Sequence, residues 1–175
     1  MGIFDKLRSI LGHGESEEPV IGDMAPPAEP VERRSRERLN ARAGTRVLIV
    51  DDSRTIVAAL TNILRSASYV TLEASNAETG LELARSEQPE LIFLDIVLPG
   101  MNGFSALRII RKDPALRDIP VIMISGNEQA TEQFFGARIG ADDFMKKPFS
   151  RLEVFARIER LLDADLIPRR ASAVE

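Results

Sequence analysis

The sequence contains no cysteine among its 175 residues. Disulfides, thiolate metal sites and thiol catalysis are therefore excluded. It also has no apolar run of the ~18–20 residues that cross a bilayer, and its start, Met-Gly-Ile-Phe-Asp, lacks the regions of a secretory signal. These absences predict a soluble protein, and the lack of cysteine suits a reducing, cytoplasmic compartment.

Basic residues are fewer than acidic ones, and histidine is almost missing. The formal net charge of −4 argues against the broad positive surface that non-specific nucleic-acid binding needs, so we expect no nucleic-acid partner. The single histidine, His13, lies in a polar stretch. We assign it no role, because an isolated imidazole there is ordinarily solvated.

Composition divides the chain into four parts. Residues 1–13 have apolar side chains at helical spacing and predict a short amphipathic helix. We favour docking on a partner, with contact to a membrane surface or to the chain's own domain as alternatives. Residues 14–44 are rich in Pro, Glu and Arg and predict a flexible polar linker. Residues 45–164 predict one globular domain, and residues 165–175 form a tail too short for an output domain.

The globular part alternates strand and helix patterns. Strands are predicted at residues 46–50, 69–74, 91–95, 121–124 and 143–145. Helices are predicted to begin after Ser53, Asn76, Asn102, Asn127 and Ser150, each of which can cap a helix. In the last helix, Ser150 and Glu153 form a capping-box pattern, and the apolar face is predicted to bury Leu152, Phe155, Ile158 and Leu162.

This alternation predicts an α/β fold with a parallel sheet and helices on both faces, because parallel strands need crossover connections. The first, third and fourth strands are almost entirely apolar, as strands buried on both faces are. Ligands of such open sheets bind at the carboxyl ends of the strands. Residues that directly follow the strands are therefore the candidates for a functional site.

Polar side chains gather at those strand ends: Asp51, Asp52, Asp95, Ser125 and Lys147. Three clustered carboxylates repel one another unless a cation offsets their charge, and an all-oxygen ligand set suits Mg²⁺. With the metal and the ammonium neutralising charge and the hydroxyl donating, the set suits phosphoryl transfer onto Asp95. Each residue alone also fits a helix cap, a turn or a solvated surface charge. Their coincidence favours a site.

The motifs Val-Leu-Ile-Val-Asp51-Asp52-Ser, Leu-Ile-Phe-Leu-Asp95-Ile-Val-Leu-Pro99-Gly100-Met-Asn-Gly103, Ile-Ser125-Gly126 and Lys147-Pro148-Phe149 resemble the response-regulator receiver family of two-component systems. The resemblance spans residues 45–163 and implies a flavodoxin-like receiver fold with strand order 2-1-3-4-5. Over the whole chain, similarity is greatest to stand-alone receivers of chemotaxis-like and twitching-motility pathways, partly through Asp52-Ser53-Arg54.

The same resemblance implies roles for individual residues. Asp95 accepts phosphate from a histidine kinase or a histidine phosphotransfer protein. Asp52, Asp95 and the Val97 carbonyl ligate Mg²⁺, with Asp51 acting through water. Lys147, before a cis peptide bond to Pro148, contacts the phosphoryl group; Ser125 also binds it and pairs with Phe144 as a conformational switch.

The resemblance further implies that the protein is not an enzyme but a signalling phosphoacceptor, which assists its own phosphorylation and dephosphorylation. Its output passes through protein contacts, by the face of the fourth helix, fifth strand and fifth helix, to an unknown downstream protein. The Phe144 ring has no phenolic hydroxyl, which many relatives carry there. A plain core aromatic is the alternative reading of Phe144.

Three other classes of protein remain as alternatives. A haloacid-dehalogenase-type hydrolase would want a second acid two residues after the nucleophile, where Val97 stands. A dinucleotide-binding domain would want a G-x-G-x-x-G loop after the first strand, and the sequence there is Asp-Asp-Ser-Arg-Thr. A purely structural partner would not need the acid cluster or Lys147.

Overall fold

The computed structural model describes residues 38–136 and 140–170. The predictions for residues 1–13 and for most of the linker lie outside the described residues. Within them, strands and helices alternate along the chain. The elements are β1 Arg46–Val50, α1 Arg54–Arg65, β2 Val70–Ala74, α2 Ala77–Glu87, β3 Leu91–Asp95, α3 Gly103–Lys112, β4 Val121–Ser125, α4 Glu128–Gly136, β5 Asp143–Lys146 and α5 Arg151–Glu159.

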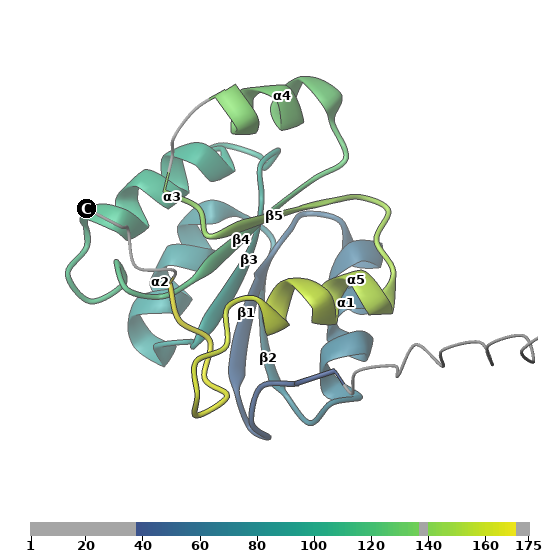
Figure 1. Ribbon diagram of the computed structural model, residues 1–175. Coiled ribbons are helices and arrows are strands. Elements are labelled where there is room, and N and C mark those ends of the chain that lie inside the picture. Colours follow the sequence, from purple (N-terminus) through teal and green to yellow (C-terminus); the bar gives the residue numbers. More distant parts are fainter. Residues whose placement is uncertain (1–37, 137–139, 171–175) are drawn as a thin grey trace, which may run out of the picture. The chain divides into compact units, whose positions relative to one another are not determined.

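The strands form one parallel sheet of five strands in the order β2-β1-β3-β4-β5. Figure 1 shows α1 and α5 on one side of this sheet and α2 and α3 on the other. The predicted fold class, strand order and two-sided covering are confirmed. None of the helices in the described part of the chain is long and apolar enough to cross a membrane.

Two apolar cores lie on the two faces of the sheet. One core joins the sheet to α2, α3 and α4 through residues such as Leu81 and Leu107, and the other joins it to α1 and α5 through residues such as Leu60 and Ile158. Because both faces are covered, β3 and β4 are buried along their whole length. Polar groups at the strand ends are therefore the ones that face solvent or each other.

Three asparagines cap helices as predicted. The side chains of Asn76, Asn102 and Asn127 each accept a hydrogen bond from the backbone N three residues further on, at 2.8, 2.9 and 3.0 Å respectively. These bonds satisfy amides that a helix leaves unpaired at its first turn. The prediction for Ser53 was wrong in one respect, because Ser53 occupies the cap position without a side-chain cap bond.

The prediction for α5 needs a correction. The Ser150 hydroxyl accepts from Glu153 N at 3.1 Å, but within the described residues the Glu153 carboxylate contacts Arg157 at 3.3 Å and not the Ser150 amide. Only half of the capping box forms. Leu152, predicted to be buried, is 65% exposed, and Val154 is buried in its place. Phe155 and Ile158 are buried as predicted, whereas Leu162 lies beyond the end of α5 and is only partly buried. The buried face is therefore rotated toward Val154, which lies one turn before Ile158 on the same side of the helix.

Candidate functional site

The acidic residues that follow β1 and end β3 converge on one lysine. Lys147 Nζ lies 2.6 Å from Asp51 Oδ2 and 2.8 Å from Asp95 Oδ2. Carboxylate oxygens of Asp51, Asp52 and Asp95 all lie within 4.8 Å of one another. The side chains of Asp51 and Asp95 are almost completely buried, whereas Asp52 is exposed. The predicted acid cluster and its lysine therefore form one site at the carboxyl edge of the sheet.

Local backbone bonds fix the two buried carboxylates. Asp51 Oδ1 accepts from Ser53 N at 2.9 Å, and Asp95 Oδ1 accepts from Val97 N at 3.2 Å. Each acid thus closes a turn between its strand and the following segment. The start of α3 also packs tightly here: a Cβ on Gly103 would lie 2.1 Å from the Asp95 carbonyl oxygen. Glycine at position 103 is what lets the helix approach the end of β3.

Lysine 147 reaches the cluster from the end of β5. Its backbone N donates to the Ser125 carbonyl at 2.8 Å, which extends the pairing of β4 with β5. The bond from Lys147 to Pro148 is cis, as the family resemblance implies. The Lys147 side chain is only 15% exposed, so its ammonium is held between the two buried acids and not in solvent.

Burial and charge shift the protonation of these groups. Burial raises the pKa of Asp95 above its usual value, and the Asp51 charge raises it further, while Lys147 and the Val97 amide act to lower it. Burial alone would lower the pKa of the Lys147 ammonium. The contacts and charges of Asp95 and Asp51 outweigh burial and raise that pKa. Lysine 147 is therefore cationic at neutral pH, and it only partly offsets the carboxylates.

The donor set fits a hard divalent cation. Three carboxylates face one ammonium, so the fully ionised site carries a surplus of negative charge. Asp51 Oδ2 is buried, and its partner within the described residues is the Lys147 ammonium, 2.6 Å away, which Asp95 shares. One ammonium cannot neutralise two buried carboxylates, so a further cation would lower the cost of burying them. All-oxygen ligands of this kind suit Mg²⁺.

Three predicted site residues do not join the cluster through their side chains. The buried Ser125 hydroxyl exchanges hydrogen bonds with the Asn127 backbone, accepting from N at 3.1 Å and donating to O at 3.3 Å. Phe144 is 8% exposed and packs against two rings of α4. Its ring centroid lies 4.8 Å from that of Phe134, in a stacked arrangement, and 5.4 Å from that of Phe135, edge-on. Val97 has an exposed side chain and lies beside Asp95.

A groove of about 570 Å³ opens beside the cluster, between α1 and β2. Asp51, Asp52 and Arg54 line one end of it, and the hydrogen-bonded pair of Thr61 and Glu73, 2.7 Å apart, lines the other. The groove gives solvent and other molecules access to the exposed Asp52. Sequence reasoning missed it, because contacts between α1 and β2 carry no local motif.

The aromatic contacts of α4 were also missed. Phe134 and Phe135 are adjacent in sequence and so point to different sides of a helix, yet both rings contact Phe144. Phe135 is 72% exposed, which is unusual for so large an apolar side chain. A pair of neighbouring phenylalanines on an otherwise polar helix was the available signal.

Comparisons with known proteins agree with this geometry. The family model described as the response regulator receiver domain matches residues 47–159. Protein PilH of Pseudomonas aeruginosa is 40% identical over 117 residues, which cover 67% of this chain and 97% of PilH. The alkaline phosphatase synthesis transcriptional regulatory protein PhoP of Bacillus subtilis is 35% identical over 117 residues, 67% of this chain but only 48% of PhoP.

Solved structures show the same fold. The chemotaxis protein CheY4 of Vibrio cholerae has a TM-score of 0.63 and 26% identity, and the match covers 69% of this chain and 100% of CheY4. A response regulator of Chloroflexus aurantiacus has a TM-score of 0.62 and 29% identity, covering 67% of this chain and 96% of that one.

A parallel five-stranded sheet with an acid cluster and a lysine at its carboxyl edge defines a receiver-type phosphorylation domain. The chain belongs to the response regulator receiver domain family. This places it in phosphorylation-activated two-component signalling, among proteins that act as signalling regulators. The predicted likeness to stand-alone receivers is confirmed by the near-complete match to PilH and CheY4.

Proposed function

We propose that Asp95 is the phosphoryl acceptor and that a phosphohistidine, on a histidine kinase or a histidine phosphotransfer protein, is the donor. In this reaction an Asp95 carboxylate oxygen attacks phosphorus, an O–P bond forms, the N–P bond of phosphohistidine breaks, and the electron pair of that bond returns to the imidazole. The observation that carries the proposal is the shared ammonium: Lys147 lies 2.8 Å from Asp95 Oδ2. The phosphoryl oxygens of the product would meet that charge.

A Mg²⁺ ion would be held by Asp52, Asp95 and the Val97 carbonyl, with Asp51 acting through water. When bound, the ion would neutralise the charge that develops on the phosphoryl oxygens. The surplus of carboxylates over the single ammonium supports this assignment. Asp51 also holds Lys147 from the far side at 2.6 Å, which orients the ammonium toward Asp95.

Ser125 and Phe144 would couple the site to the surface. Ser125 ends β4, one residue after the residue that pairs with Asp95 in the sheet, and its hydroxyl bonds the Asn127 backbone. Turning that hydroxyl toward a phosphoryl group would break these bonds and change the start of α4. Phe144 packs against the same helix through Phe134, so a shift of α4 would change its packing.

The output would pass through protein contacts on the face of α4, β5 and α5, to a downstream protein. On this face Phe135 and Lys146 are exposed beside the largely buried Phe144. Receiver domains are phosphorylated by histidine kinases and contact downstream partners. In the proposed division of the chain, residues 1–13 would supply a second contact, 14–44 a tether, 45–164 the receiver and 165–175 a tail. Within the described residues, Ala41 of the tether and residues 165–170 of the tail lie against the receiver. The protein would be a signalling phosphoacceptor that assists its own phosphorylation and dephosphorylation.

The test is phosphotransfer from a phosphorylated histidine kinase or phosphotransfer protein in the presence of Mg²⁺. Wild type should be labelled, and Asp95→Asn should not. Asp118→Asn is the matched control, because Asp118 is 87% exposed and lies outside the cluster. Full labelling of the Asp95→Asn protein, or labelling of wild type that does not depend on Mg²⁺, would contradict the proposal.

A further inference from the structure

After α5 the chain stays in contact with the domain. Residues 161–170, which we call the C-terminal strap, form a tight reversal. Leu162 pairs with Pro168 in an antiparallel bridge, and Arg169 N donates to the Leu161 carbonyl at 2.7 Å. Asp163 closes the turn, since its Oδ1 accepts from the amides of Asp165 at 2.9 Å and Ile167 at 3.0 Å.

The strap is fastened to the domain at both ends. Leu161 and Pro168 are buried, and the Leu166 carbonyl accepts from Arg42 N at 3.1 Å. Its last residue, Arg170, donates to Asp142 Oδ1 at 3.0 Å and to the Arg117 carbonyl at 3.1 Å. Figure 1 shows this segment running past the lower end of the sheet, away from the ends of β3 and β4 where the acid cluster lies.

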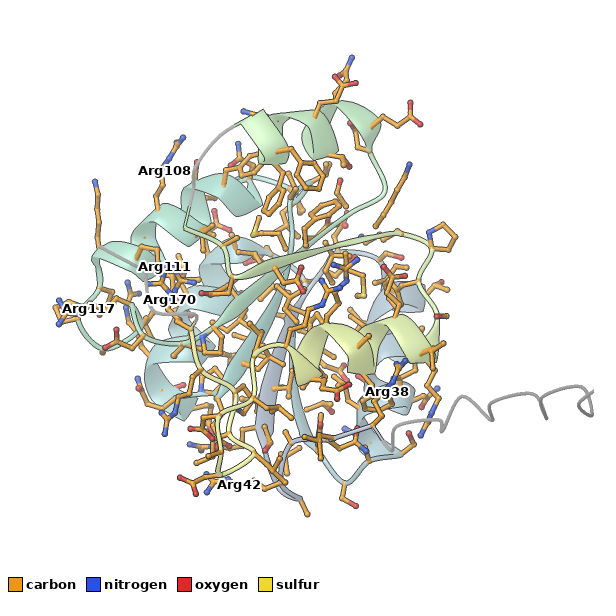
Figure 2. All side chains as sticks on the ribbon, viewed as in Figure 1. Arg38, Arg42, Arg108, Arg111, Arg117 and Arg170 are labelled. Atoms are coloured by element: carbon orange, nitrogen blue, oxygen red, sulfur yellow. The ribbon has the colours of Figure 1, made fainter. Side chains whose placement is uncertain are left out.

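Asp142 is the point where the strap meets the sheet. Its side chain is only 2% exposed, and its Oδ2 accepts from Arg111 and from the amide of Val121, both at 2.8 Å. Arg111 further donates to the Gly140 carbonyl at 2.7 Å, so the connection between α4 and β5 is held from α3. Figure 2 shows Arg111, Arg117 and Arg170 gathered on this side of the molecule.

Strand β5 begins at the residue after Asp142 and is four residues long. It carries Phe144 in its interior and leads directly to Lys147, which contacts Asp95. β5 is an edge strand and pairs only with β4. The strap is therefore joined through Asp142 to both groups that the proposed function uses.

We propose that the C-terminal strap is a latch that stabilises the unphosphorylated conformation by holding Asp142, and hence the start of β5, in its present position. This inference rests on the proposed function, because it requires that phosphorylation shifts β5 or α4. A ligand that favours the shifted state must then work against the bonds that Arg170 makes. By linkage, a change that weakens the latch raises the affinity for the ligand, and binding of the ligand weakens the latch.

The test compares full-length wild type with Arg170→Ala in a calorimetric titration with beryllofluoride and Mg²⁺, a probe that stands in for the phosphoryl group. Arg169→Ala is the matched control, because Arg169 is 62% exposed and contacts Asp163 inside the strap instead of Asp142. We expect Arg170→Ala to bind about fivefold more tightly than wild type, at the low end of typical coupling, and Arg169→Ala to bind as wild type does. A second measurement uses wild type alone: amide exchange in residues 161–170 should become faster when beryllofluoride binds.

The outcomes separate the two proposals. Absence of beryllofluoride binding to wild type overturns the proposed function, and the latch with it. Normal binding to wild type, with equal or weaker binding to Arg170→Ala, leaves the proposed function intact and overturns the latch. If Arg170→Ala does not fold, the exchange measurement decides, and unchanged or slower exchange of the strap overturns the latch.

Discussion

The buried carboxylates at the two edges of the sheet differ in how far neighbouring cations compensate their charge. At the amino edge, Asp142 is met by two guanidinium groups and a backbone amide, all within 3.0 Å. At the carboxyl edge, Asp51 and Asp95 share a single ammonium. A satisfied buried acid stabilises a fold, whereas an under-compensated one provides a place for a cation.

The largest expected effect concerns Asp142, at the amino edge of the sheet. Asp142→Asn should lower the free energy of unfolding by about 3–5 kcal/mol, because it leaves the Arg111 guanidinium largely buried without its carboxylate. Burial already lowers the pKa of Arg111 to about 10 despite the opposing charge of Asp142. Urea unfolding at neutral pH measures the loss. The exposed Asp118→Asn should change stability by less than about 0.5 kcal/mol, and a similarly small loss for Asp142→Asn would refute the contrast.

The second effect concerns the acid cluster at the carboxyl edge of the sheet. Mg²⁺ at 100 times its dissociation constant should stabilise the wild type by about 2.7 kcal/mol, since the ion binds the folded site. Asp51→Asn and Asp52→Asn should lose most of this gain, while Asp118→Asn should keep it. Thermal unfolding with Mg²⁺ and with a chelator gives the comparison. An equal gain in all four proteins would mean that the ion binds elsewhere.

A smaller effect concerns pH in the presence of a chelator. The pKa of Asp95 is raised by burial, so the folded protein holds this proton to higher pH than the unfolded chain does. Wild-type stability should therefore fall as pH rises from the ordinary carboxyl pKa of 3.8 through the raised folded pKa, and stay level beyond it. Asp95→Asn lacks this loss, so its stability relative to wild type should rise over that window. A constant stability difference between the two proteins from pH 4 to 8 would contradict the assigned cause.

The smallest effect lies away from both edges. Leu152→Ala should change stability by less than about 0.5 kcal/mol, because Leu152 is 65% exposed. The fully buried Val154, two residues further along the same helix, is the matched position, and Val154→Ala should cost more because it leaves a cavity. Urea unfolding of both variants checks the order. A larger loss of stability for Leu152→Ala than for Val154→Ala would instead support the helix face that the sequence pattern predicts.

Strand and helix order, the parallel sheet and the acid cluster were predictable because they depend on local patterns. A buried run followed by Asp51 and Asp52, or by Asp95, is visible within a few residues, and topology brings those ends together. The rotation of α5 was not predictable, because Leu152 and Val154 are both apolar and only packing chooses between them. The docking of the strap was not predictable either, because Arg170 and Asp142 are 28 residues apart and no local sequence pattern links them.

The most direct measurement of the central claim is the chemical identity of the modified residue. After phosphorylation with Mg²⁺, reduction of the acyl phosphate with borohydride converts the modified aspartate to homoserine, which mass mapping of peptides can locate. We predict homoserine at position 95 and intact aspartate at positions 51 and 52. Homoserine at position 51 or 52, with Asp95 unchanged, would contradict the assignment of Asp95 as the phosphoryl acceptor.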